Sequence, residues 1–290
     1  MAARRCCIIA RAKVALQRCD NLSRGPRKIN MPTYSVSLLD GLVPSCRARL
    51  RQFQELIAQL NAATVIDGAD GDAIDVAAAI DTAVADFHIE FEPDGAMLSC
   101  AALPDYAPHH VCFNRGPAAP DGGDPLRRAI GGAATVIDAT AGWGMDAARL
   151  ARWGCRVTAV EKHPVVAALL QHAHAQCRGA DVRARLTVVH ADSVAFLRDL
   201  AAADAPDVVY LDPMYPPNPK SAAAKKPLTM LRLLAGPPGD NRALFDAAIA
   251  NARRRVVVKR PHRAPPLAPH KTGETTGKLA RFDIYKPSAA

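Results

Sequence analysis

The chain has 290 residues, of which 49% are hydrophobic and 22% charged, and this composition is typical of a folded protein rather than a disordered one. No uninterrupted apolar run is long enough to span a bilayer, which argues against an integral membrane protein. The eight cysteines include no Cys-x-x-Cys pair, so the pattern predicts neither a disulfide framework nor a zinc site and fits a reducing compartment.

The net charge of +9 is unevenly distributed along the chain. Residues 1–30 carry eight basic and one acidic residue, residues 31–212 carry 14 and 23, and residues 213–290 carry 15 and four. A basic excess concentrated in the C-terminal part favours a polyanionic partner. The alternative is an ordinary soluble surface that happens to be basic.

The first thirty residues are rich in arginine and nearly free of acids, which is typical of a mitochondrial presequence. A start site assigned too early, with Met31 opening the folded protein, explains the same pattern. We therefore expect residues 1–30 to be a basic extension outside the fold. The expected compartment is the cytoplasm, or the mitochondrial matrix if the extension is a presequence.

Residues 31–120 are predicted to form a small α+β region that ends in a linker. Helices are expected over residues 47–60 and 74–87, and residues 88–91 and 96–100 are expected to pair as a hairpin. The stretch 114–124 is rich in Gly and Pro, as loops are. The run of residues 109–112, His-His-Val-Cys, lacks a second ligand pair at usable spacing, so no metal is expected.

Strands alternate with helices over residues 121–290. The expected strands cover residues 134–138, 156–161, 186–190, 208–211, 255–259 and 281–285, and the expected helices cover residues 146–153, 163–177 and 193–202. This alternation implies right-handed crossovers and a parallel sheet. The sequence thus predicts a doubly wound, Rossmann-like α/β domain that binds its ligand at the carboxyl ends of the strands.

Polar side chains follow the first three of these strands. Asp138 precedes a turn of small residues in which Gly142 and Gly144 let the backbone approach a ligand closely. Glu161 ends the second strand, where a carboxylate can accept both hydroxyls of a ribose. Residues 190–193, which include Asp192 and Ser193, end the third strand, where a polar side chain can contact an adenine edge. The third glycine of the dinucleotide pattern is absent, which argues modestly against a nicotinamide cofactor.

The fourth strand delivers Asp212-Pro213-Met214-Tyr215 to its tip. This arrangement is typical of enzymes that methylate amino nitrogens. A nucleobase amine is a poor nucleophile because its lone pair is delocalised into the ring, and acceptors for both N–H bonds favour the pyramidal, nucleophilic form. Asp212 and the Pro213 carbonyl would supply these acceptors, and Tyr215 would stack on the base. Together with the three preceding strand ends, this tip favours S-adenosylmethionine (SAM) as the cofactor.

Three segments resemble the RsmJ family of SAM-dependent methyltransferases: residues 138–147, 161–170 and 208–216. Shorter matching segments lie at 220–226, 256–261, 264–268 and 281–285, so the resemblance covers roughly residues 134–285. It implies a class I SAM methyltransferase sheet and methylation of a guanosine at N2 in small-subunit (16S-type) rRNA. Met214, in place of a second proline, is the family-specific residue that narrows the amine to guanine N2.

Carried over position by position, the resemblance places SAM contacts at Met145, Asp146, Glu161, Lys162, Asp192, Ser193 and Asp212. Phosphate contacts with RNA are expected from Lys220, Lys225, Lys226, Lys259 and Arg260. The segment 122–128 departs from the basic, glycine-rich pattern of the family, and residues 31–120 match no motif of the family. The expected partner is the rRNA or the ribosomal subunit, with no membrane, no metal and a monomeric protein.

Three alternatives stay open. The strand-four motif by itself does not exclude the same chemistry on another amine, such as adenine N6 or a protein glutamine. A non-catalytic RNA-binding protein with a methyltransferase fold is disfavoured by the intact acids at 138, 161, 192 and 212. A nicotinamide-dependent oxidoreductase would leave the Asp-Pro-Met-Tyr tip unexplained.

Overall fold

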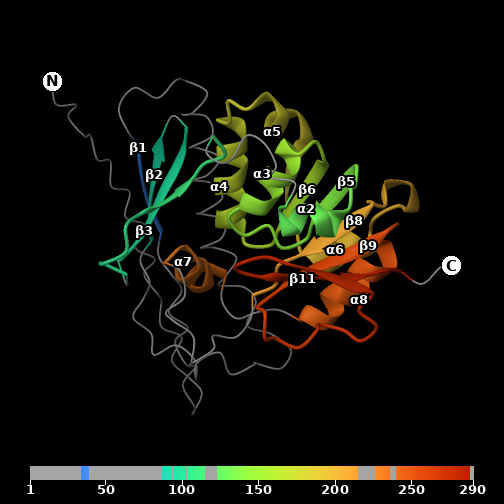
Figure 1. Cartoon of the computed structure of the whole chain (residues 1–290). Helices are drawn as coiled ribbons and strands as arrows, with labels where there is room; N and C mark the ends of the chain where they lie inside the picture. Colours follow the sequence, from blue (N-terminus) through green and yellow to red (C-terminus); the bar gives the residue numbers. More distant parts are fainter. Residues whose placement is uncertain are drawn as a thin grey trace, which may run out of the picture. The chain divides into compact units, whose positions relative to one another are not determined.

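The computed structural model describes residues 34–38, 87–92, 94–101, 103–114, 123–214, 226–235 and 240–287 (Figure 1). The chain divides into two compact units, Met1–His110 and Val111–Ala290. The helix expected over residues 47–60 lies outside the described residues. Of the helix expected over 74–87 only Phe87 is described, and it begins a strand.

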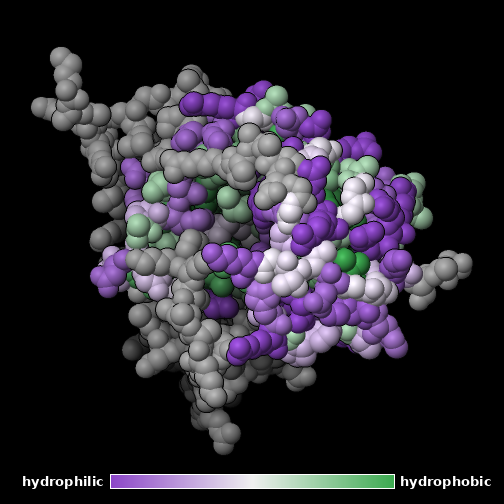
Figure 2. Space-filling view, in the orientation of Figure 1, coloured by the Kyte–Doolittle hydropathy of each residue, from purple (hydrophilic) through white to green (hydrophobic). Residues whose placement is uncertain are grey.

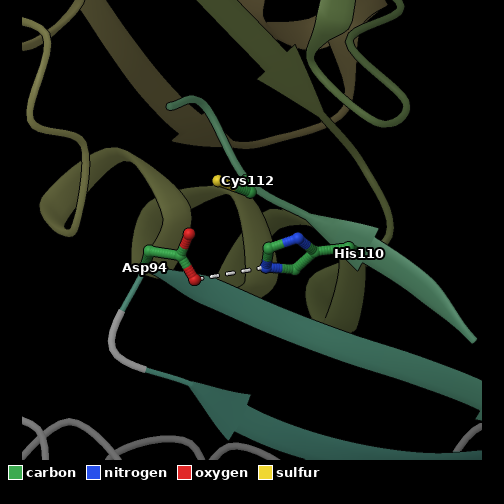
Figure 3. Close-up of side chains that lie close together, drawn as sticks. All are labelled: Asp94, His110 and Cys112. Atoms are coloured by element: carbon green, nitrogen blue, oxygen red, sulfur yellow. Dashed lines mark ion pairs between the residues drawn. The ribbon is translucent and has the colours of Figure 1, made fainter. Parts of the chain in front are cut away.

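A four-stranded sheet forms the described part of the first unit, in the order β1-β2-β3-β4. The strands are β1 (Tyr34–Leu38), β2 (Phe87–Glu92), β3 (Gly95–Cys100) and β4 (His109–Val111). The predicted hairpin is confirmed, because β2 and β3 pair antiparallel. Asp94 directly precedes β3, and its Oδ1 lies 3.5 Å from Nε2 of His110, a residue of β4 (Figure 3).

A seven-stranded sheet forms the centre of the second unit, in the order β10-β11-β9-β8-β5-β6-β7. Its strands are β5 (Thr135–Asp138), β6 (Arg156–Glu161), β7 (Leu186–His190), β8 (Val208–Leu211), β9 (Arg255–Arg260), β10 (Gly273–Thr276) and β11 (Arg281–Tyr285). The five strands from β9 to β7 are parallel, whereas β11 pairs antiparallel with β9, and β10 pairs antiparallel with β11. Along the chain, β6 and β7 are added on one side of β5, and the next strand, β8, is added on the other side of β5. The strand order therefore reverses between β5 and β8. Ligands of such sheets bind at this switch point.

Helices cover both faces of this sheet (Figure 1). They are α2 (Pro125–Ile130), α3 (Met145–Arg152), α4 (Pro164–Ala175), α5 (Ala180–Arg185), α6 (Ser193–Arg198), α7 (Lys226–Ala235) and α8 (Asn241–Asn251). Val209 and Leu211 of β8 pack with Phe245 of α8 in one core cluster. Tyr210, between them, points to the opposite face, where its hydroxyl donates to Asp146 of α3 at 2.8 Å. The period of two along the strand thus separates an apolar face from a polar one.

The predicted doubly wound sheet is confirmed, with differences at several elements. The helix expected over 193–202 ends at Arg198, and a short 3₁₀ helix follows at Ala202–Asp204. No Gly or Pro follows Arg198 directly, so nothing local marks this end. The strand expected over 255–259 extends to Arg260, and helices α7 and α8 fall in a stretch for which no element was expected. Asp240 begins α8 by accepting the backbone N–H groups of Arg242 and Ala243.

The surface of the second unit is largely hydrophilic on the face shown in Figure 2. In the described part of the chain, the large hydrophobic side chains that are exposed are Met145, Leu228 and Leu279. Across the same residues, every helix is too short or too polar to pass through a lipid bilayer.

Candidate functional site

A cleft opens at the carboxyl ends of β5, β6 and β8, where the strand order reverses. Its empty volume, open mouth included, is about 790 Å³. Seven residues expected from the sequence line it: Gly142, Glu161, Lys162, Asp192, Ser193, Asp212 and Pro213. The topology therefore gathers residues from four separate strand ends, those of β5, β6, β7 and β8, into one cavity.

Glu161 is held rigidly in the cleft by two backbone amides. Its Oε2 accepts from Gly142 N at 2.9 Å, and its Oε1 accepts from His163 N at 2.8 Å. Burial raises the pKa of this carboxyl, and the two amide bonds counteract the rise. Each oxygen keeps a lone pair, so the carboxylate can still accept hydroxyl groups of a ligand.

The next strand end presents Asp192 and Ser193 at the start of α6. Asp192 Oδ1 accepts from Val194 N and Ala195 N, both at 3.0 Å, and so caps the helix. The Ser193 hydroxyl donates to the Ala139 carbonyl at 2.7 Å, which ties α6 to the end of β5. Both capping bonds use the same oxygen, which leaves Oδ2 of Asp192 available to a ligand.

Asp212 follows β8 and has its backbone and side chain fixed by different partners. Its N–H donates to Thr140 Oγ1 at 2.6 Å, and its Oδ2 accepts from Lys259 Nζ at 2.6 Å. Solvent in the cleft reaches 37% of this side chain. The protein packed around the carboxyl still raises its pKa by desolvation, against the opposing effect of the Lys259 ammonium, and Asp146 adds to the rise. An oriented carboxylate thus faces the cavity.

Beneath the cleft lies a cluster of ionisable groups made of Asp138, Asp146, Tyr210 and Lys259, which contacts Asp212. Lys259 Nζ lies 3.0 Å from Asp146 Oδ2 and 2.6 Å from Asp212 Oδ2, so it bridges two carboxylates. Desolvation raises the pKa of Asp138 to about 8, with further contributions from Asp146 and Asp212. Asp138 therefore holds its proton near neutral pH, which reduces the negative charge of the cluster.

Four of the expected cofactor residues do not line the cleft. Asp138 and Asp146 lie in the cluster of ionisable groups, and Met145 is exposed on the surface. Gly144 precedes α3 with φ of +69°, and a Cβ on it would lie 2.8 Å from Phe113 Cζ. Packing and backbone conformation are thus sufficient reasons for this glycine. Cofactor contacts by these four stay predictions.

The expected RNA contacts fall into different surroundings. Lys259 is engaged by two carboxylates, and Arg260 is buried with its guanidinium donating to the Pro265 carbonyl. These placements give both side chains partners inside the protein. Lys220, Lys225 and the stacking residue Tyr215 lie outside the described residues, and Lys226 begins α7 without a described side chain.

One wall of the cleft was not expected from the sequence. It is formed by α7 and the start of α8, through Leu231, Ala235, Asp240, Asn241 and Leu244. Asp240 offers a weak sequence signal, because an acid followed by a helical pattern is typical of an N-cap. The apolar residues of this wall offer no such sequence signal, because their pattern is that of ordinary core residues.

We expect Glu161→Gln to weaken SAM binding about 10- to 100-fold, because charged acceptors contribute about 1.5–3 kcal/mol per hydrogen bond. The amide nitrogen cannot accept, so either Gly142 N or His163 N also loses its partner. Isothermal titration calorimetry would measure the affinity. Glu274→Gln, an exposed substitution on β10, is the matched control. Equal affinity in the two variants would contradict a role for Glu161 in cofactor binding.

The sheet order and the cleft at its switch point define a class I, Rossmann-like methyltransferase fold. A family model described as "Putative SAM-dependent methyltransferase" matches residues 113–287. The crystal structure of a SAM-dependent methyltransferase from Neisseria gonorrhoeae superposes with a TM-score of 0.61 at 27% identity, over 89% of this chain and 97% of that one.

Curated relatives named ribosomal RNA small subunit methyltransferase J are similar to this chain over about half of its length. The protein of Legionella pneumophila (strain Lens) is 42% identical over 153 residues, 52% of this chain and 63% of that protein. That of Thioalkalivibrio sulfidiphilus is 45% identical over 171 residues, 56% and 67% of the two chains. The chain therefore belongs to the ribosomal RNA small subunit methyltransferase J family of SAM-dependent methyltransferases. It spans 63% of the length of the Legionella relative.

Proposed function

We propose that the protein is a SAM-dependent methyltransferase that modifies a guanosine at N2 in small-subunit rRNA. The observation that carries this proposal is the oriented carboxylate of Asp212, which shares one cleft with Pro213 and Glu161. The names of the relatives support the rRNA substrate. The basic excess of residues 213–290 agrees with a polyanionic partner.

The residues of the cleft fit SAM. Glu161 is an acceptor for ribose hydroxyls, Asp192 is an acceptor for the adenine edge, and Gly142 leaves the backbone open to close approach. When bound, SAM supplies a methyl group that its sulfonium charge has already activated. The protein is therefore required to orient the amine and to hold its protons.

Asp212 performs the main step on the substrate side. One oxygen accepts an N–H of the guanine amine, and the Pro213 carbonyl accepts the other, so the nitrogen lone pair is directed away from the ring. As the new N–C bond forms, the bond between the methyl carbon and the sulfonium sulfur would break and leave a neutral thioether. The surplus proton leaves the nitrogen for the carboxylate and then for solvent. Tyr215 stacks on the base, a contact of about 1–3 kcal/mol for an aromatic ring. Acceptors placed in advance are effective because they need no reorganisation during the reaction.

The experiment that tests this function is nucleoside analysis after incubation of small-subunit RNA with the protein and methyl-labelled SAM. Label in N2-methylguanosine is the expected result. Label in N6-methyladenosine or in protein would contradict the guanine assignment, and no transfer to any acceptor would contradict the enzyme class. Free 16S-type rRNA and assembled subunits, supplied separately, would identify the form of the substrate. We also expect a cytoplasmic monomer, which cell fractionation and light scattering would check.

A further inference from the structure

Lys259 and Asp212 meet because their strands are neighbours in register. β8 and β9 pair in parallel, with Leu211 opposite Val258, so Asp212 and Lys259 each follow one residue later. Leu211 and Val258 both belong to the core cluster under α8. Alternation along the strands therefore directs Lys259 to the opposite face, which carries Tyr210.

The two carboxylates that share the Lys259 ammonium differ in their other partners. Asp146 Oδ1 is bound by Arg149 at 3.0 Å, and its Oδ2 accepts the Tyr210 hydroxyl at 2.8 Å. Asp212 has a single cation within ion-pair distance among the described residues, namely Lys259 at 2.6 Å. Loss of the ammonium would thus leave Asp146 paired with Arg149 and Asp212 without a counter-ion.

We propose that Lys259 is a positioning residue for methyl transfer: by binding Oδ2 of Asp212 it leaves Oδ1 to accept the substrate N–H, and it keeps this carboxylate ionised. The inference rests on the proposed function of Asp212. It differs from the phosphate contact expected of Lys259 from the sequence, because the ammonium is directed into the protein between β8, β9 and the start of α3.

The charges around Asp212 show why a cation is needed there. Asp146 faces it from α3, Asp138 from β5 and Tyr210 from its own strand, with Arg149 behind Asp146. Desolvation and Asp146 raise the pKa of Asp212, and Lys259 is the group that lowers it. Without Lys259 the pKa of Asp212 would rise further, and a protonated carboxyl accepts the amine N–H less well.

The first test follows the charge of Asp212 without any substrate. In protein labelled with ¹³C at the Asp carboxyl carbons, the Asp212 signal is identified by its loss in Asp212→Asn and titrated against pH. We expect Lys259→Met to move its midpoint upward by about 1–3 pH units, the usual effect of removing an adjacent opposite charge. Lys259→Arg should restore the midpoint to within about half a unit. An unchanged midpoint in Lys259→Met would overturn the proposal.

The second test separates positioning from phosphate binding. We expect Lys259→Met to lower the methylation rate about 10- to 100-fold at neutral pH, with activity recovering as the pH rises. RNA affinity and its dependence on salt should stay as in the wild type and in Lys278→Met, an exposed control. Weaker RNA binding, with the slope of the logarithm of the binding constant against the logarithm of the salt concentration reduced in magnitude by about one, would instead assign a phosphate contact to Lys259. That result would contradict its positioning role.

Folding of the variant is controlled separately. Thermal unfolding should show a native-like transition for Lys259→Met. If it does not, Lys259→Met combined with Asp146→Asn removes one of the two carboxylates that face the lost ammonium, and the upward shift of the Asp212 midpoint is expected there too. Failure of wild-type protein to methylate rRNA would refute the proposed function, whereas the carboxyl titration would still decide the role of Lys259.

Discussion

Asp212→Asn is expected to slow methyl transfer at least about 100-fold at saturating SAM, because preorganised acceptors at a reacting group typically contribute this much. Asparagine keeps the shape of the side chain, but its single acceptor oxygen would face the Lys259 ammonium, so that the NH₂ group, which only donates, would face the amine. The Thr140 contact uses the backbone of residue 212 and should persist. Single-turnover assays with labelled SAM measure the step directly.

The variant also separates catalysis from binding. SAM affinity should change by less than about tenfold, because Glu161 and Asp192 remain in the cleft. Asp246→Asn, an exposed substitution on α8, controls for the loss of one negative charge. Wild-type turnover in Asp212→Asn would sink the assigned role, and a rate lost only through SAM affinity would reassign Asp212 to cofactor binding.

Gly144→Ala is expected to lower the free energy of unfolding by about 2–5 kcal/mol. Positive φ costs an L-residue about 1–2 kcal/mol, and overpacking of a filled core typically costs about 1–3 kcal/mol more. The added Cβ would lie 2.8 Å from Phe113 Cζ and 2.9 Å from Leu170 Cδ2. Urea unfolding followed by circular dichroism would measure the change.

Gly132→Ala is an unusually close control for this substitution. Gly132 has the same φ of +69°, and no atom lies within 4 Å of a Cβ built on it. The difference between the two alanine variants thus isolates the steric contribution from the backbone strain. Equal destabilisation would show that Phe113 and Leu170 move aside freely. Loss of SAM affinity without loss of stability would support the cofactor role predicted for Gly144 from the sequence.

The sheet was largely predictable because its strands carry local signals. Three of the predicted parallel strands, β6, β7 and β8, and the antiparallel β11 have the expected bounds. Each is a short run, rich in apolar residues, that lies between turn-forming residues. Such a run is typical of a strand buried in a sheet. The acids that end β6 and β8 were predicted to meet for the same reason, since carboxyl ends of parallel strands share one edge.

The partners inside the site were not predictable, because they come from distant parts of the sequence. Lys259 looks like a surface lysine until Asp212 and Asp146, 47 and 113 residues away, are placed beside it. Leu231 and Leu244 likewise carry no local sign that they face a cleft. Gly144 is the opposite case. Its position in the motif suggests cofactor binding, but close packing also requires a glycine there, and only the three-dimensional neighbours reveal this requirement.

The proton on Asp138 makes the stability of this protein depend on pH. An unfolded aspartate is ionised above pH of about 4, whereas the folded carboxyl has a pKa of about 8, so folding takes up a proton near neutral pH. Because the folded state binds more protons, stability falls as pH rises, by about 1.4 kcal/mol per unit in this window. Unfolding of wild type and Asp138→Asn at about pH 6 and pH 8 checks this, and equal slopes would refute it. Alkaline conditions therefore weaken the sheet that supports the cleft, and the proton that Asp138 holds in the folded state limits the stability of the protein on the alkaline side.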